Sequence, residues 1–372
     1  MTLPLVHLIV GARPNFMKAA PLWRSLSGVD WCEPRLIHTG QHYSAEMSDV
    51  FLDELGLPKP HHSLGVGSGS HAEQTAAIMV AYEKVLLAER PEWIVVIGDV
   101  NSTLAATLTA KKLNLKVAHL EAGLRSFDRS MPEEINRIVT DSLADLLWTP
   151  SPDGDENLLR EGVSPDRIEQ VGNIMIDAYE MMRAKIEASK PFAKFGLRGN
   201  EFAVVTLHRP ANVDDALRLN ALVDDLLLIA DSIPIVFPLH PRTRGRLQAL
   251  DQVKRLEGHP AIRLINPLGY IEFMSFVVRA KLVITDSGGV QEETTYLGIP
   301  CLTVRPNTER PITVTAGTNR LVAEGMLVES VRSVMAEPVK ELVPLPLWDG
   351  RAAERVAASL RRRLVSKAVI CG

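Results

Sequence analysis

The sequence predicts an α/β protein made of two doubly wound domains, each built on a parallel sheet, that face each other across a cleft. Strand-like runs alternate with helix-like segments along the whole chain, which is the pattern of parallel α/β layers. The length of 372 residues favours two domains, each large enough to bury a core. The segment 190–200, KPFAKFGLRGN, is typical of a linker. We place the first domain at residues 1–172 and the second at 173–349.

In the first half, short apolar runs alternate with segments whose apolar residues recur at helical spacing, such as Ile78, Tyr82 and Val85. Pro132 and the two acids after it favour a helix start, because Pro is tolerated in a first turn and carboxylates suit the positive end of the helix dipole. Strands are predicted at 6–10, 35–39, 93–97, 117–120, 147–149 and 168–171. Helices are predicted from about 17, around 47–55, at 71–87, from 102 or 103, and at 132–147, 156–161 and 174–188.

The second half repeats this alternation without a short fixed repeat. Strands are predicted at 202–207, 235–239, 262–265, 283–285, 301–304 and 320–322. Helices are predicted at 214–230, 270–279, after 287, at 329–335 and at 351–366.

Composition excludes several classes of protein. With 46% hydrophobic and 23% charged residues and a net charge of −4, the chain offers no basic surface for nucleic acid or an anionic membrane. Cys32, Cys301 and Cys371 form no CxxC pair, which argues against a zinc knuckle or a disulfide framework. No apolar stretch reaches membrane-spanning length, and the N-terminus lacks a basic signal-peptide region. We expect a cytoplasmic protein that binds neither nucleic acid, membrane nor metal.

Polar residues collect where the predicted strands end. In doubly wound sheets, ligands sit outside the carboxyl ends of the strands, so residues at these ends are candidates for a binding site. A solvated loop role is as probable for any one of them. The residues at or just beyond predicted strand ends are Arg13, Gln41, His42, Asp99, Glu121, His208, Arg209, His240, Asp286, Ser287 and Arg305.

The stretch 282–301, LVITDSGGVQEETTYLGIPC, predicts a strand, a glycine turn and a helix. Asp286 or Ser287 can cap the helix, and Gly288 and Gly289 let a ligand approach its N-terminus, which suits phosphate. A carboxylate one turn later, Glu293, can accept hydrogen bonds from sugar hydroxyls, so the stretch favours a sugar nucleotide. The alternative is an ordinary α/β turn whose acids only complement the helix dipole.

The remaining candidates divide by chemistry. Arg13, Lys18, Arg305 and Arg310 can supply positive charge to a diphosphate, although for Lys18 taken alone a surface salt bridge is favoured. Three acids, Asp99, Glu121 and Glu133, can exchange protons with a substrate if the fold gathers them, or serve as caps and loop ligands. His208 and His240 can titrate or bind phosphate, or be structural.

Hydride transfer and nucleoside triphosphate hydrolysis have no sequence support. The chain contains no GxSxG elbow, no Walker A loop and no GxGxxG after the first strand.

Seven motifs carry a resemblance to a known family. They are GARPNFMKAAPL (11–22), VIGDVNSTLA (96–105), HLEAGLRS (119–126), PEEINR (132–137), LHRPANVD (207–214), ITDSGGVQEE (284–293) and RPNTERPITVTAGTNRLV (305–322). In order and spacing they resemble the non-hydrolysing UDP-N-acetylglucosamine 2-epimerases over almost the whole chain. That resemblance implies a GT-B-like pair of Rossmann-like domains, UDP held by the second domain, and a final helix at about 350–372 that returns to the first.

The resemblance also implies roles for individual residues. Asp99, Glu121 and Glu133 match the family's catalytic acids, and His208 would lie by the reacting centre. Glu293 would take the ribose hydroxyls. The other substrate-binding positions would be Arg13, Lys18, Arg137, His240, Ser287, Gly288, Gly289 and Arg310, and a site for an activating second substrate molecule would comprise Gln41, His42, Gln74 and Arg209. No cofactor is implied, and we expect a homodimer.

The implied reaction eliminates UDP across C1–C2 to a 2-acetamidoglucal and adds it back on the other face, interconverting UDP-GlcNAc and UDP-ManNAc for surface polysaccharides. Pro210 and Ala211 stand where activated relatives carry Arg-Glu, and the loop 124–132 is short. Substrate activation is therefore in question, and a modified sugar such as a UDP-diacetamido-uronic acid is an alternative substrate. Three further functions stay open on the sequence: a hydrolysing 2-epimerase, a GT-B glycosyltransferase and a non-catalytic nucleotide-sugar binding protein.

Overall fold

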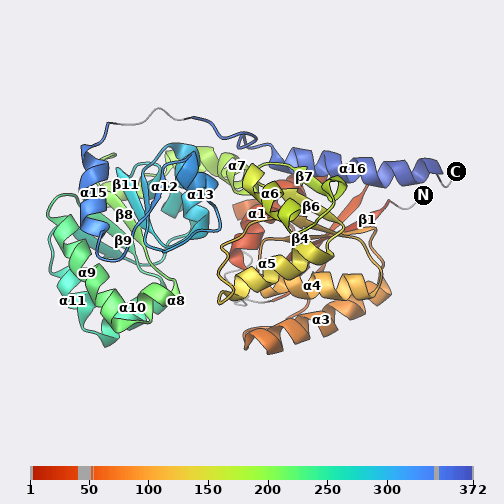
Figure 1. The fold of residues 1–372 in the computed structure, drawn as a ribbon, viewed down its shortest axis with the longest axis horizontal. Coiled ribbons are helices and arrows are strands. Elements are labelled where there is room, and N and C mark those ends of the chain that lie inside the picture. The colour runs from red at the N-terminus through yellow and green to blue at the C-terminus, as the bar shows by residue number, and fades with distance from the viewer. Residues whose placement is uncertain (1–2, 41–51, 53, 339–342, 371–372) are drawn as a thin grey trace. The chain divides into compact units, whose positions relative to one another are not determined.

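The chain forms two compact α/β units in the computed structural model, which describes residues 3–40, 52, 54–338 and 343–370 (Figure 1). The side chains of Arg13 and of residues 366–370 lie outside this description. Unit 1 comprises Met1–Ala178 and Pro346–Gly372, and unit 2 comprises Tyr179–Leu345.

Unit 1 is built on a parallel sheet of seven strands within the described residues, in the order β3-β2-β1-β4-β5-β6-β7. Its central strands are buried along their whole length, as expected for a sheet covered on both faces. The strands are β1 (Leu5–Val10), β2 (Glu33–His38), β3 (His62–Ser63), β4 (Trp93–Ile97), β5 (Val117–Leu120), β6 (Leu146–Thr149) and β7 (Ile168–Gln170).

Helices cover both faces of this sheet. In Figure 1, α3, α4 and α5 lie in a row on one side, while α1 and α16 pack together on the other. The C-terminal α16 is fixed to unit 1 by a hydrogen bond from Trp148 Nε1 to Ser359 Oγ (3.0 Å) and by Asp177, which accepts from the first backbone N–H groups of the helix. The helices are α1 (Arg13–Leu26), α3 (His71–Ala88), α4 (Asn101–Lys112), α5 (Pro132–Leu143), α6 (Pro152–Arg160), the 3₁₀ turn η1 (Pro165–Arg167) and α16 (Ala352–Ile370), and α7 (Ile174–Ala188) begins in unit 1 and continues into unit 2 from Tyr179.

Unit 2 has a six-stranded parallel sheet in the order β10-β9-β8-β11-β12-β13, counted over the described residues. Its strands are β8 (Ala203–Thr206), β9 (Ile235–Pro238), β10 (Ile262–Ile265), β11 (Leu282–Thr285), β12 (Cys301–Thr303) and β13 (Asn319–Leu321). Its other elements are η2 (Pro191–Phe195), α8 (Pro210–Val213), α9 (Ala216–Ala230), α10 (Pro241–Ala249), α11 (Gln252–Glu257), α12 (Tyr270–Val277), α13 (Gly288–Leu297), α14 (Ile312–Thr315) and α15 (Leu327–Ala336). A core of Val, Leu and Ile side chains joins α9, α15 and the sheet.

The predicted fold class, two doubly wound parallel sheets, is confirmed. The linker interpretation of 190–200 is wrong, because Phe192 stacks on Phe202 with ring centroids 6.1 Å apart and the segment forms η2 inside unit 2. The helix predicted at 214–230 is α9, which begins at Ala216 because Asp215 caps it by accepting from the N–H groups of Leu217 and Arg218; the short α8 before it was not predicted.

Other boundaries differ by a few residues. The helix α5 ends at Leu143 rather than 147, and the strand β3 and helices α10 and α11 were not predicted. The helix predicted around 47–55 lies mostly outside the described residues. In the described part of the chain, no helix is both long and apolar enough to cross a membrane.

Candidate active site

Three predicted acids lie at the carboxyl edge of the sheet in unit 1. Asp99 follows Gly98 at the end of β4, Glu121 directly follows β5, and Glu133 lies in the first turn of α5. A Cβ atom on Gly98 would be 3.2 Å from Glu121 Oε2, so the backbone that carries Asp99 lies against the Glu121 carboxylate. We call Asp99, Glu121 and Glu133 the acid cluster.

Two cations hold this acid cluster in place. Arg137, which is 2% exposed, contacts Asp99 Oδ2 through Nη1 at 2.5 Å and the buried Glu134 through Nη2 at 2.6 Å. Lys18 forms a buried ion pair with Glu121 Oε2, so the surface salt bridge considered for Lys18 is wrong. Each pair fixes one oxygen of the acid, because a hydrogen bond from a charged donor to a carboxylate is strong and directional.

The acid cluster also contains a carboxylate oxygen that can accept a further hydrogen bond. Glu121 Oε1 is buried and has no hydrogen-bond partner among the described residues. Glu133 is half-buried in the first turn of α5. A buried, unpaired carboxylate oxygen is costly in a protein at rest, and an incoming ligand proton or hydroxyl would satisfy it.

Gln74, a candidate for an activator site, belongs to an amide network behind Asp99. Its Nε2 donates to the Gly67 carbonyl at 3.0 Å, and its Oε1 accepts from Asn101 Nδ2 at 2.8 Å. Asn136 completes the network by donating from Nδ2 to the Asp99 carbonyl at 2.8 Å. These bonds fix the backbone of the loop that carries Asp99.

The helix α13 of unit 2 begins at Gly288 with free N–H groups. Its N-cap residue, Ser287, makes no capping bond with its side chain. Asp286 does not cap α13 either, because both of its oxygens accept from the loop after β8, including the N–H groups of His208 and Arg209 at 2.9–3.1 Å. Ser287 therefore occupies the predicted N-cap position without the predicted side-chain bond, the cap by Asp286 is wrong, and the helix start is left open to an anion.

Arginines surround this helix start. A Cβ on Gly288 would lie 2.5 Å from Arg310 Nη1 and 2.6 Å from Glu309 Oε1, so only glycine fits there, whereas Gly289 has no atom within 4 Å of that position. Glu309 is buried and contacts Arg310 (2.6 Å), Arg305 (2.8 Å) and Arg209 (3.7 Å). We call Gly288, Arg209, Arg305, Glu309 and Arg310 the arginine cluster.

The arginine cluster carries surplus positive charge. Burial alone would raise the pKa of Glu309, but the charges of Arg310 and Arg305 and a hydrogen bond from Arg305 outweigh it and hold the pKa well below its usual range. Glu292 is the second carboxylate, at 2.9 Å from Arg310 Nε. Three guanidinium groups thus share two carboxylates, and the buried Arg305 Nη1 and Arg209 Nε have no partner among the described residues. Such donors suit a diphosphate.

Glu293 lies one turn and a half into α13 and is only 4% exposed. It accepts a hydrogen bond from the Tyr270 hydroxyl at 2.7 Å. Burial raises the pKa of Glu293 to about 8, although the Tyr270 hydrogen bond opposes this rise and the nearby Glu292 adds to it. A carboxyl in this state gains from any ligand hydroxyl that donates to it.

His208 and His240 stand together beyond β8 and β9, with ring centroids 5.9 Å apart. His208 contacts the buried Asp286 through Nδ1 at 2.8 Å, which leaves Nε2 directed away from the carboxylate. Although burial would raise the pKa of Asp286, hydrogen bonds and charge from His208 and bonds from Arg209 and Asn212 lower it. Burial and His208 lower the pKa of His240. An ionised Asp286 can therefore orient a protonatable His208.

The comparison with known proteins decides the family. A family model described as UDP-N-acetylglucosamine 2-epimerase matches residues 24–361. A UDP-N-acetylglucosamine 2-epimerase of Methanocaldococcus jannaschii is 42% identical over 95% of this chain and 98% of its own. The chain belongs to the UDP-N-acetylglucosamine 2-epimerase family.

Two more members of this family are informative. A UDP-2,3-diacetamido-2,3-dideoxy-D-glucuronate 2-epimerase of Pseudomonas aeruginosa is 40% identical over 95% of this chain and 98% of its own. The crystal structure of the M. jannaschii UDP-GlcNAc 2-epimerase in complex with UDP-GlcNAc and UDP is similar with a TM-score of 0.87 and 40% identity, over 96% of this chain and 99% of that one.

Within this family fold, the predicted site residues form two groups. Unit 1 holds Lys18, Gln74, Asp99, Glu121, Glu133 and Arg137, whereas unit 2 holds His208, Arg209, His240, Ser287, Gly288, Gly289, Glu293 and Arg310. Gln41, His42 and the side chain of Arg13 lie outside the described part of the chain.

Sequence reasoning missed two buried acids, Glu134 and Glu309. Glu134 accepts from the backbone N–H groups of Ser126 and Phe127 and pairs with Arg137, so it fixes the loop before α5. Glu309 joins the arginines of unit 2. Their signal in the sequence is a carboxylate close to an arginine, as in PEEINR and ERP, because a buried cation needs a partner.

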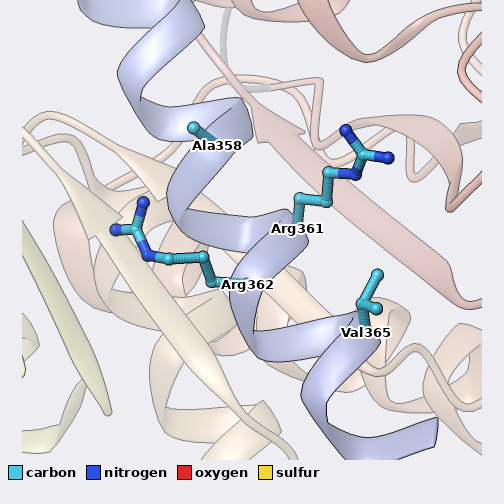
Figure 2. A pocket seen from close by; sticks show the side chains of 4 residues that line it. All are labelled: Ala358, Arg361, Arg362 and Val365. Carbon is cyan, nitrogen blue, oxygen red and sulfur yellow. The ribbon is translucent and has the colours of Figure 1, made fainter.

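A shallow hollow on α16 is not part of either group. Figure 2 shows its lining by Ala358, Arg361, Arg362 and Val365, all from the exposed face of one helix. No acid or histidine lines it. We assign it no function.

Proposed function

We propose that this chain interconverts UDP-GlcNAc and UDP-N-acetylmannosamine (UDP-ManNAc), as the name of the M. jannaschii relative suggests. Loss of the C2 proton and of UDP from C1 gives a 2-acetamidoglucal. UDP then adds back to C1 while a proton returns to C2. C2 is inverted because the glycal has rotated or because the proton is delivered to its other face. The C2 hydrogen is not acidic enough for simple exchange, so a leaving group at C1 is required. The product would be a precursor of surface polysaccharides.

The acid cluster would carry out the proton transfers. Asp99, Glu121 and Glu133 are the candidates for the base that takes the C2 proton and the acid that returns one. The observation that supports this most is the pairing of Asp99 with Arg137 and of Glu121 with Lys18, because each pair fixes one carboxylate oxygen while the other oxygen of Glu121 is buried and free. The substrate would also be bound by Lys18, Arg137 and Arg13, and it would enter the site beside Glu133.

Unit 2 would hold the leaving group. Negative charge on the diphosphate grows as the C1–O bond breaks, so donors fixed in advance favour the transition state. Ser287, Gly288 and Gly289 would bind it at the start of α13 together with Arg310. His208, oriented by Asp286, would protonate or bind the departing phosphate, with His240 beside it, and Glu293 would accept from the ribose hydroxyls.

Incubation with UDP-GlcNAc in D2O tests this proposal. We expect UDP-ManNAc to form and deuterium to appear at C2 in both sugars, as measured by chromatography and NMR. Accumulation of UDP and free N-acetylmannosamine without UDP-ManNAc would replace it by a hydrolysing 2-epimerase. Sugar transfer to an acceptor without deuterium at C2 would indicate a glycosyltransferase.

A modified UDP-sugar is the second candidate substrate. The P. aeruginosa relative, named for a diacetamido-uronate, is 40% identical to this chain, almost as similar as the M. jannaschii relative at 42%. A panel with both sugars would decide, since only the true substrate should show a high kcat/KM.

Activation by a second substrate molecule stays a proposal for Gln41, His42, Gln74 and Arg209. In this chain Pro210 begins the short helix α8, and Arg209 contacts Glu309 in the arginine cluster. Both features favour a substrate-binding role for Arg209. Hyperbolic rather than sigmoidal rates with UDP-GlcNAc would support the loss of activation.

We also propose a homodimer formed through α3. Val80 and Leu87 lie seven residues apart on the same face of this helix and are 59% and 64% exposed. Exposed apolar side chains on one helix face favour burial against a second copy.

A further inference from the structure

A buried ionic network links the two loops that carry Asp99 and Glu121. His119, on β5, donates from Nε2 to the Gly98 carbonyl at 2.8 Å and contacts Asp141 Oδ1 through Nδ1 at 2.6 Å. Gly98 directly precedes Asp99, and His119 lies two residues before Glu121. Both the histidine and Asp141 are fully buried.

The second oxygen of Asp141 binds the chain that follows Glu121. Oδ2 accepts from the Gly123 N–H at 3.0 Å and from Arg125 Nη1 at 2.7 Å. Asn157 binds the Gly123 carbonyl at 2.9 Å, and a Cβ on Gly123 would lie 2.4 Å from the Gly154 carbonyl oxygen. One carboxylate thus fixes the backbone before and after Glu121.

The turn it fixes is strained. Glu121 has φ of 72°, a left-handed conformation that is unfavourable for a residue with a Cβ. Its N–H and that of Ala122 both donate to the Trp148 carbonyl at 3.1 and 3.0 Å. Such a conformation persists only where the surroundings impose it.

The network also fixes the orientation of the His119 ring. Its Nε2 donates to the Gly98 carbonyl, which can only accept, and its Nδ1 faces Asp141 Oδ1. Asp141 is ionised: burial would raise its pKa, but the charges and hydrogen bonds of His119 and Arg125 lower it. Arg125 in turn is held by Glu161 at 2.8 and 2.7 Å. The other charged groups near this turn are Glu121, Lys18 and Asp99.

We propose that Asp141 is a positioning residue that acts through the His119 ring to set the distance between the Asp99 and Glu121 loops. This inference rests on the proposed epimerisation, in which both acids transfer protons. It predicts that loss of the network slows C2 proton transfer without weakening the binding of UDP to unit 2.

The test compares Asp141→Asn with Asp145→Asn. Asp145 is the matched control, since it also pairs with a cation, Lys111, and accepts a backbone N–H, that of Val117, but at the opposite end of β5. We expect Asp141→Asn to lower kcat and the rate of deuterium entry at C2 at least tenfold, with KM and UDP affinity unchanged. Asp145→Asn should leave kcat unchanged. Equal loss of kcat in both variants, or none in Asp141→Asn, would overturn the proposal.

Two further measurements separate this idea from misfolding and from failure of the proposed function. His119→Gln should show the same split between kcat and KM, even if Asp141→Asn does not fold. In wild-type protein labelled with ¹⁵N at histidine, the His119 signals should show a proton on Nε2 and a hydrogen bond at Nδ1, and a ring without a proton on Nε2 would refute the network as described. If wild-type protein shows no C2 exchange at all, the proposed function fails, whereas the ring-nitrogen result still reports on the network.

Discussion

Replacing Glu293 by Gln should stabilise unit 2 while weakening its affinity for UDP. The physical reason is the buried carboxyl, whose pKa rises from 4.5 to about 8 in the folded protein because of burial. Gln has nearly the same shape and can still accept from the Tyr270 hydroxyl, so the variant removes the titration and little else.

The size of the effect follows from proton linkage. Between pH 4.5 and about 8, the unfolded chain has lost this proton while the folded protein keeps it, so the free energy of unfolding falls as pH rises through that window. At about 1.4 kcal/mol per unit of pH, the cost is about 3 kcal/mol at pH 7 and under about 1 kcal/mol at pH 5. Below pH 4.5 the group contributes nothing, and above pH 8 the cost is constant.

Hydrogen exchange measured by mass spectrometry can resolve this effect within the chain. Tryptophan fluorescence cannot, because all five Trp residues lie in unit 1. Peptides from β11 and α13 of Glu293→Gln should exchange more slowly than those of wild type at pH 7.5, and almost equally at pH 5. Peptides from unit 1 serve as the internal control.

The Glu293→Gln variant should also test whether the ribose hydroxyls of UDP bind Glu293. If its hydroxyls donate to the ionised Glu293, UDP binding at pH 7 must release a proton that the unliganded carboxyl held. Calorimetry in buffers of different ionisation enthalpy should therefore show more proton release for wild type than for Glu293→Gln. Equal proton release in the two proteins, or a variant that exchanges faster at pH 7.5, would refute the reasoning.

Three other predictions concern Asp99, the start of α13 and the exposed face of α3. Asp99→Asn should slow C2 deuterium exchange by about 10²–10⁴-fold, the range for loss of a general acid or base, with UDP still bound in calorimetry; full activity would remove Asp99 from the catalytic set. Gly288→Ala should destabilise unit 2 by about 1–3 kcal/mol in denaturant unfolding, because its Cβ would clash with Arg310 and Glu309, whereas Gly289→Ala should not. Val80→Asp should yield a monomer in sedimentation equilibrium while the exposed control Glu83→Gln stays dimeric; a dimer in both would place the interface elsewhere.

The fold was predictable because its central strands are short, largely apolar runs. β4 and β5 are buried along their whole length and have the predicted bounds, since a strand buried on both faces allows few polar residues and ends where they begin. The partly buried β10 also has the predicted bounds. The same rule located the candidate site, because polar residues just past such strands must lie at the carboxyl edge. Asp99 and Glu121 were predicted at that edge and lie there.

What the sequence did not reveal depends on contacts between distant residues. Glu309 contacts the distant Arg209, and Asp286 takes its role from the loop after β8 rather than from the helix beside it. A short side chain before a helix is equally suited to either use. The helices α10 and α11 were missed because neither has an extended apolar stripe; only Thr243, Leu247 and Leu256 are buried in them.

The backbone conformation and burial of Glu121 lower the stability of the fold but suit its proposed role in proton transfer. A left-handed backbone costs a non-glycine residue about 1–2 kcal/mol, and glycine at this position would avoid that cost. The chain instead places a buried carboxylate there, pairs it with Lys18 and leaves one oxygen without a partner among the described residues. The left-handed backbone and the buried, unpaired oxygen are both unfavourable for a purely structural turn. Both are explained if a ligand binds this oxygen during function, and the Asp141 network holds the oxygen in place before the ligand binds.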